Sequence, residues 1–179
     1  MITLENIGSL PIKFSDAQKR GKLRRHPLLP AKSFQKGDRK INITREVLEQ
    51  MAANLNDGKL GNRRMVTLAH PKADKLDETK AQGWIMSGSA EVSTYQDTVA
   101  LYCNVEWLPG MEKAIENKEY GFISPVFSMR HIDEQGEDIG PALLFAGVTN
   151  NPHWTNQPEL WEQLLLAYCM TRTLHKLTS

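Results

Sequence analysis

The sequence predicts an α+β fold in which several short strands build a barrel-like sheet, with three helices between or after them. Two patterns support this prediction. Residues 98–107 alternate, so that Val99, Leu101, Cys103, Val105 and Trp107 share one face of a strand. Residues 44–56 instead place apolar side chains at helical spacing. A chain of 179 residues is also long enough to bury one core.

The helix predicted at 44–56 has signals at both ends. Thr44 is a residue type that caps helices, and Glu46 suits the positive end of the helix dipole. Its apolar stripe consists of Val47, Leu48, Met51, Ala52 and Leu55, and Asn56-Asp57-Gly58 can end it. A second, short helix is predicted over 109–118, because Pro109 fits a first helical turn.

The third predicted helix occupies the C-terminal segment, 156–179, and follows a core domain at 1–155. Asn156 and Glu159 form a capping-box pair, and Pro158 fits the first turn. The apolar face of this helix consists of Leu160, Trp161, Leu164, Leu165 and Tyr168. Because such a face is too large to leave in water, we expect it to pack on the core or against a second copy of the chain.

Further strands are predicted from short apolar runs bounded by polar or turn residues. Pro125 interrupts one of them, which indicates a sheet edge or a bulge. Polar loops are predicted at 71–80 and 133–140. The predicted strands cover 65–69, 83–87, 121–129 and 143–148, with less regular runs at 10–14 and 28–34.

The composition is that of a cytoplasmic globular protein. The formal net charge of +1 provides no field for nucleic acid or a membrane, and no apolar run approaches membrane-spanning length. A basic run at 19–25 is best interpreted as a solvated loop, with contact to an acidic partner or nucleic acid as the alternative. Cys103 and Cys169 lack metal-ligand spacing and are expected to be buried thiols.

Two residues stand out as candidates for chemistry in a chain without familiar catalytic motifs. His70 lies where a buried strand meets a polar loop, and Ser124 lies in an apolar strand directly before Pro125. From these positions alone, a structural role is favoured for each residue. The five histidines are scattered, so no metal site or cofactor is predicted.

Six blocks, taken in order, resemble the capsid-assembly protease of phage Mu and its prophage relatives. Each block is short, but their shared order makes the resemblance specific. They are Leu28-Leu29-Pro30-Ala31 with Phe34, residues 66–70 ending in His70, residues 81–85, residues 105–110, residues 119–127 around Ser124, and residues 146–152.

The resemblance implies a prohead serine endopeptidase with Ser124 as nucleophile and His70 as general base. Such proteases are similar to herpesvirus assemblin, which implies a β-barrel surrounded by helices and pairing into a homodimer. Implied substrates are the internal scaffold protein and the chain's own C-terminal extension, inside the procapsid in the host cytoplasm. The major capsid protein is a further implied partner.

The third catalytic member stays open among Glu106, Asn150 and His153. Each has a structural alternative, as a solvent-facing strand end, a turn former or a surface residue. One departure from the family is that Thr67, Leu68 and Ala69 carry no charge where relatives often have acidic residues before the histidine. The alternative function is therefore a catalytically weak or inactive module of the same fold that binds scaffold or capsid protein during assembly.

Overall fold

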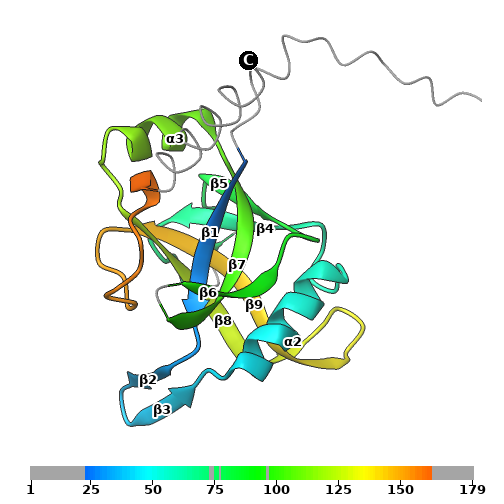
Figure 1. Cartoon of the computed structure of the whole chain (residues 1–179). Coiled ribbons are helices and arrows are strands. Elements are labelled where there is room, and N and C mark those ends of the chain that lie inside the picture. Colours follow the sequence, from blue (N-terminus) through cyan, green and yellow to red (C-terminus); the bar gives the residue numbers. More distant parts are fainter. Residues whose placement is uncertain (1–22, 73–74, 77, 96, 163–179) are drawn as a thin grey trace, which may run out of the picture.

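The computed structural model describes residues 23–162, except 73–74, 77 and 96 (Figure 1). The predictions for residues 10–14, Cys169 and most of the C-terminal helix lie outside these residues, as does most of the basic run. Within the described part, strands of one large sheet and two complete helices form an α+β fold, as predicted. None of the helices found there is long and apolar enough to cross a membrane.

The main sheet has seven strands and mixes parallel and antiparallel pairing. Its order is β1-β7-β5-β4-β9-β8, with β6 also paired to β7. Only β4 and β9 run parallel. The strands are β1 (Leu23–Pro30), β4 (Arg63–Leu68), β5 (Gly83–Met86), β6 (Glu91–Tyr95), β7 (Thr98–Trp107), β8 (Phe122–Ile132) and β9 (Asp138–Thr149). A separate two-stranded sheet pairs β2 (Ser33–Lys36) with β3 (Arg39–Asn42).

The main sheet curls into a half-barrel whose end strands, β1 and β8, come close without pairing (Figure 1). The buried side chain of Gln157 bridges this seam. Its Nε2 donates to the carbonyl oxygens of Pro27 in β1, at 3.1 Å, and Ile123 in β8, at 2.7 Å. The Gln157 side-chain amide thus stands where backbone hydrogen bonds between β1 and β8 would close a barrel. The predicted barrel-like sheet is therefore open between these two strands.

Both complete helices match their predictions. Helix α2 (Arg45–Asn56) begins after Thr44, whose hydroxyl accepts from the Val47 amide at 3.3 Å. Its buried face packs against β6, β7 and β9. Helix α3 (Pro109–Glu116) begins at the proline and buries Met111 and Ile115.

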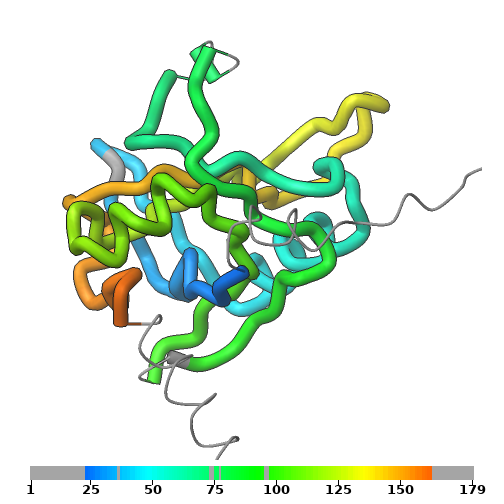
Figure 2. The backbone as a smooth tube through the Cα atoms, turned by 90° about the horizontal axis from the view of Figure 1, so that it is seen from above, coloured from blue at the N-terminus to red at the C-terminus, as the bar shows by residue number. Residues whose placement is uncertain are grey.

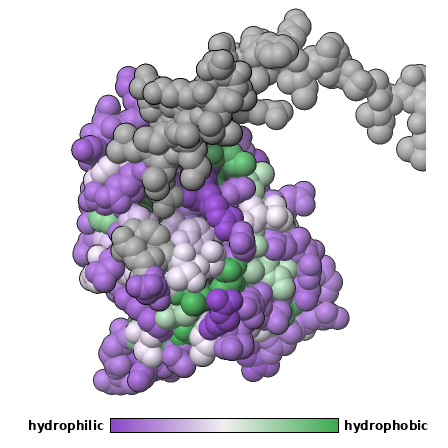
Figure 3. Space-filling view, viewed as in Figure 1, coloured by the Kyte–Doolittle hydropathy of each residue, from purple (hydrophilic) through white to green (hydrophobic). Residues whose placement is uncertain are grey.

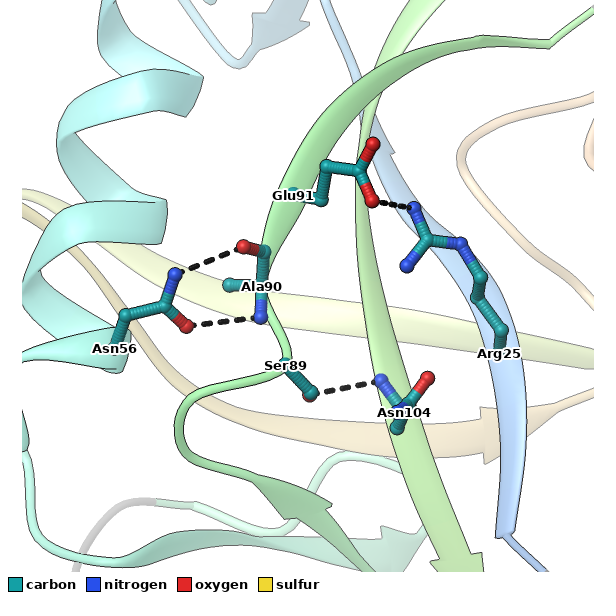
Figure 4. Close-up of polar contacts among 6 residues, drawn as sticks. All are labelled: Arg25, Asn56, Ser89, Ala90, Glu91 and Asn104. Atoms are coloured by element: carbon teal, nitrogen blue, oxygen red, sulfur yellow. Dashed lines mark hydrogen bonds and ion pairs between the residues drawn. The ribbon is translucent and has the colours of Figure 1, made fainter.

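A polar connection fixes α2 to the loop before β6 (Figure 4). The Asn56 side chain both donates to the Ala90 carbonyl and accepts from the Ala90 amide, each at 2.9 Å. The neighbouring Ser89 hydroxyl accepts from the Asn104 amide of β7, also at 2.9 Å. At the surface, Arg25 of β1 forms an ion pair with Glu91 of β6 at 2.5 Å. The Asn56 contacts thus tie the helix to the segment that leads into β6, and the other two contacts tie that region to β7 and β1.

The C-terminal helix starts later than predicted. Asn156 lies in a turn, and helical structure begins at Leu160. The Leu160 amide donates to the Gly121 carbonyl at 2.7 Å, which ties this start to the residue before β8. The turn before the helix carries Gln157 into the seam. The capping-box prediction is therefore wrong, because Asn156 and Glu159 both precede the first helical residue.

The hairpin of β8 and β9 is longer than predicted and extends beyond the rest of the sheet (Figure 2). Its outer part is exposed, since antiparallel pairing continues past the apolar residues.

Strands β3 and β6 were missed because both carry many polar side chains. Leu68 is exposed although a buried strand was expected there. The face shown in Figure 3 is largely hydrophilic, with smaller apolar patches.

The core contains one histidine, His26, which is 1% exposed. Its Nε2 accepts from Trp107 Nε1 at 3.0 Å, while no described group bonds its Nδ1. Burial, with a smaller contribution from Arg24, lowers the His26 pKa to about 3, so the imidazole is neutral. Burial also raises the pKa of the neighbouring Cys103 thiol to about 12, as expected for a buried, unreactive cysteine.

We predict that His26 makes the protein sensitive to mild acid. Its folded pKa of about 3 lies below its unfolded value of about 6.5, so the unfolded state binds a proton that the folded state excludes. The free energy of unfolding therefore contains a contribution from neutral His26 that is fully present above pH 6.5. This contribution is lost as the pH falls towards 3, by about 1.4 kcal/mol per pH unit. Urea unfolding between pH 7.5 and 4.5 measures the slope.

The matched variant is His26→Gln, which can still accept from Trp107 but cannot titrate. The slope of its free energy of unfolding against pH should correspond to the uptake of about one proton fewer on unfolding than in the wild type. An identical slope in the two proteins would show that another group controls the acid sensitivity.

Candidate active site

The segment that carries His70 leaves β4 through a strained turn. Ala69 has a φ of +56°, in the left-handed region that is uncommon for residues other than glycine. Two hydrogen bonds hold it there. The Ala69 amide donates to the Val148 carbonyl at 2.9 Å, and the Thr67 hydroxyl lies 2.7 Å from the Ala69 carbonyl oxygen. The turn that presents His70 is therefore fixed to strand β9.

Gly147 lets this turn lie directly against β9. It stands between Thr67 of β4 and Ser124 of β8 in the register of the three strands. A Cβ at Gly147 would lie 2.6 Å from His70 Cδ2, and still closer to the Ala69 carbonyl oxygen. Because real Cβ atoms do not approach other atoms this closely, the position requires glycine in this arrangement.

His70 reaches Ser124 across Gly147. Its Nε2 lies 3.0 Å from the main-chain carbonyl oxygen of Ser124, so Nε2 carries the proton in this arrangement. The contact follows from the alternation of carbonyl directions along β8. The Ile123 carbonyl faces β1 and Gln157, and that of Ser124 faces the opposite side. Among the described residues, none forms a hydrogen bond with the Ser124 hydroxyl.

Both residues line one cleft of about 410 Å³ next to the open seam, a volume typical of ligand sites. His70 is exposed, while Ser124 is only 6% exposed. His153 lines the same cleft from the turn after β9. The structure thus brings together three of the residues singled out from the sequence, one from each of three separate segments.

The other two candidates for a third member lie elsewhere. The Asn150 side chain accepts from the Gly121 amide at 2.8 Å and donates to the Glu119 carbonyl at 2.9 Å, so it shapes the approach to β8. Glu106 lies on β7, between Leu23 and Trp84 of the neighbouring strands. Neither lines the cleft.

Within the described part of the chain, no three side chains of His, Cys, Asp or Glu are grouped so that they could hold an ion. The lining residues with polar atoms in their side chains are Gln35, His70, Ser124, His153, Trp154 and Gln157. A hydroxyl with imidazoles nearby is a set of groups suited to proton transfer and nucleophilic attack.

Three residues that shape the site were not singled out from the sequence: Thr67, Gly147 and Gln157. Gly147 did carry a signal, because a glycine inside a strand often marks a close backbone approach. Thr67 looked like an ordinary strand residue, and Gln157 like part of a helix start. Their roles depend on segments far away in the sequence.

We predict that Gly147→Ala displaces His70 and destabilises the protein. The added methyl group overlaps the backbone at Ala69, which must move, and overpacking of this kind costs about 1–3 kcal/mol. Urea unfolding measures the loss, and the nuclear Overhauser effect between the His70 ring and residue 147 reports the displacement.

Gly110→Ala is the control, because that glycine lies in α3 with open space where a Cβ would be. Alanine there should leave stability unchanged or raise it by up to about 1 kcal/mol. Equal stability of Gly147→Ala and wild type, with the ring contact retained, would contradict the close approach.

The comparisons with known proteins agree with the sequence blocks. No curated protein and no solved structure shows a significant match to this chain. A family model described as "Mu-like prophage I protein, N-terminal domain" matches residues 26–160, which include the cleft and all the strands except the first three residues of β1. The chain therefore belongs to the Mu-like prophage I protein family, as the six blocks predicted.

Proposed function

We propose that this chain is a serine endopeptidase in which Ser124 is the nucleophile and His70 the general base. The observation that carries the proposal is the position of the His70 ring, with Nε2 3.0 Å from the main chain of Ser124 in a shared cleft. Membership of the phage family supports it. In a chain without other catalytic motifs, the cleft brings a histidine and a serine together.

Catalysis requires a small rearrangement from the arrangement observed. His70 Nε2 must turn from the Ser124 carbonyl oxygen to the hydroxyl of the same residue, and it must give up its proton to Nδ1 so that it can accept one. The imidazole then takes the Ser124 proton as the oxygen attacks the peptide carbonyl. The imidazolium protonates the leaving amine, and water later hydrolyses the acyl-enzyme.

The third member of the site is assigned to His153 in this proposal. A catalytic imidazole needs an acceptor on its second ring nitrogen to hold its tautomer and orientation. Of the three candidates, only His153 lines the cleft, and the Asn150 amide is already engaged by Glu119 and Gly121. A neutral His153 would accept from Nδ1 of His70 and act as a positioning residue.

The biological setting rests on the family and not on the geometry. A Mu-type prohead protease would cleave the internal scaffold protein and its own C-terminal extension within the procapsid in the host cytoplasm. The major capsid protein and a second copy of the chain are the other expected partners. We also propose that the open half-barrel is similar to the fold of herpesvirus assemblin.

A non-catalytic assembly module is the second candidate function. It is favoured by one observation, namely that His70 bonds the Ser124 carbonyl and not the hydroxyl. If that contact is permanent, the two residues only tie β4 to β8. The same fold would then bind scaffold or capsid protein without cleaving it.

Labelling with a serine-reactive fluorophosphonate distinguishes the two functions. We expect covalent modification at Ser124, located by mass spectrometry, and complete loss of labelling in Ser124→Ala. Ser128→Ala is the matched control, because Ser128 lies four residues along β8, outside the cleft, and its hydroxyl donates to the Arg130 carbonyl. Modification of another residue, or labelling that survives Ser124→Ala, would refute the assignment.

His70→Gln should reduce both labelling and scaffold cleavage by about a thousandfold or more, since serine and base act as a unit. The control is His131→Gln, a histidine on β8 outside the cleft, which should keep wild-type rates. Cleavage by His70→Gln at the wild-type rate would assign the base to a different residue.

A further inference from the structure

The walls of the cleft are apolar and carry no formal charge. Pro125, Val126 and Phe127 line it from β8, and Phe34 and Ile41 line it from the small β2–β3 sheet. None of these five side chains is fully buried, so they can meet a ligand. No Asp, Glu, Lys or Arg of the described residues contributes to the lining.

The cleft continues the seam between the two end strands of the half-barrel. Gln157 closes the seam at Pro27 and Ile123. The next residues along both strands, 28–30 of β1 and 124–127 of β8, line the cleft. The cleft therefore follows both strands for several residues beyond the Gln157 bridge.

The edge of β8 that faces this space lacks one donor. Backbone groups alternate in direction along a strand, so Pro125 faces the same side as Ile123, whose carbonyl accepts from Gln157. Proline has no amide hydrogen, and at Pro125 the missing hydrogen would point to the seam and not to β9, so no hydrogen bond between β8 and β9 is lost. The Pro125 carbonyl oxygen faces the seam as an acceptor. An extended peptide fits such a space, because strand edges recognise backbone and the pockets between them recognise side chains.

We propose that this cleft selects substrates by a bulky apolar side chain close to the scissile bond, and that it rejects charged side chains there. This inference rests on the proposed function, since it places the bond to be cleaved at Ser124. The apolar walls favour Leu, Ile, Met or Phe. An Asp, Glu, Lys or Arg would lose its water, and no residue of opposite charge lines the cleft to replace it. Lys32, whose Nζ lies 5.0 Å from the centroid of the Phe34 ring, is not among the lining residues.

The experiment uses the full chain and a peptide library made by digesting a denatured bacterial proteome, with new ends identified by mass spectrometry. We expect one fixed position, within two residues of the cut, to favour Leu, Ile, Met and Phe over charged residues by at least tenfold. Charged or glycine-rich sequences at every position near the cut would overturn the inference.

Phe34→Lys tests the wall directly, because it places a positive charge opposite the substrate side chain. The favoured residue at the selected position should change towards Asp and Glu. Ile132→Lys is the control, since Ile132 is exposed on β8 and lies outside this cleft. It should keep the wild-type preference. An unchanged preference in Phe34→Lys would overturn the inference.

Fluorophosphonate labelling of Ser124 separates this inference from the proposed function. If Ser124 is labelled but the cleavage profile shows no preference, the apolar selectivity is wrong and the proposed endopeptidase activity stands. If neither labelling nor cleavage occurs, the proposed endopeptidase activity is itself wrong.

If Phe34→Lys fails to fold, Phe34→Ala replaces it, and its wider cleft should shift the preference towards larger apolar residues. A Phe34 variant that sediments differently from the wild type but keeps the wild-type cleavage preference would show that a second copy of the chain occupies the cleft. That result would overturn the inference.

Discussion

The close approach of the His70 turn to strand β9 is the constraint on which the site depends. Strands β4, β9 and β8 are neighbours, and Thr67, Gly147 and Ser124 occupy one row across them. With no Cβ at Gly147, the turn can lie on the sheet and the ring can cross β9 to the main chain of Ser124. The Thr67 hydroxyl holds Ala69 in its strained conformation there.

The second determinant of the site is the incomplete closure of the sheet. A continuous ladder between β1 and β8 would fill the seam and leave no space beside Ser124. Instead Gln157 joins the strands at one point, and both strands have a proline whose missing amide hydrogen faces the seam, Pro27 and Pro125. The cleft therefore lies where the fold has free strand edges, which is where an extended chain can bind.

Burial separates the histidines of this fold into different chemical roles. His26 lies in the core against Trp107, and desolvation keeps it neutral down to acid pH. His70 is exposed and lines the cleft, where solvent can reach it. In sequence, His26 and His70 are each followed by a proline, so this local feature does not distinguish the two. Their depth in the fold does.

The sequence by itself determined the two complete helices, the long central strand β7 and the family, because periodicity, caps and ordered motifs can be identified along the chain. It also singled out His70 and Ser124, which the fold brings to one cleft. It did not determine the start of the last helix, the polar strands β3 and β6, or the residues that fix the site. Gly147, Thr67 and Gln157 act through the Ala69 turn and the β1–β8 seam, which join segments up to 130 positions apart. Likewise, Glu106, Asn150 and His153 were equivalent candidates in sequence. Only the folded chain distinguished them, because His153 lines the same cleft as His70 and Ser124, and a cleft is made by the packing of distant segments.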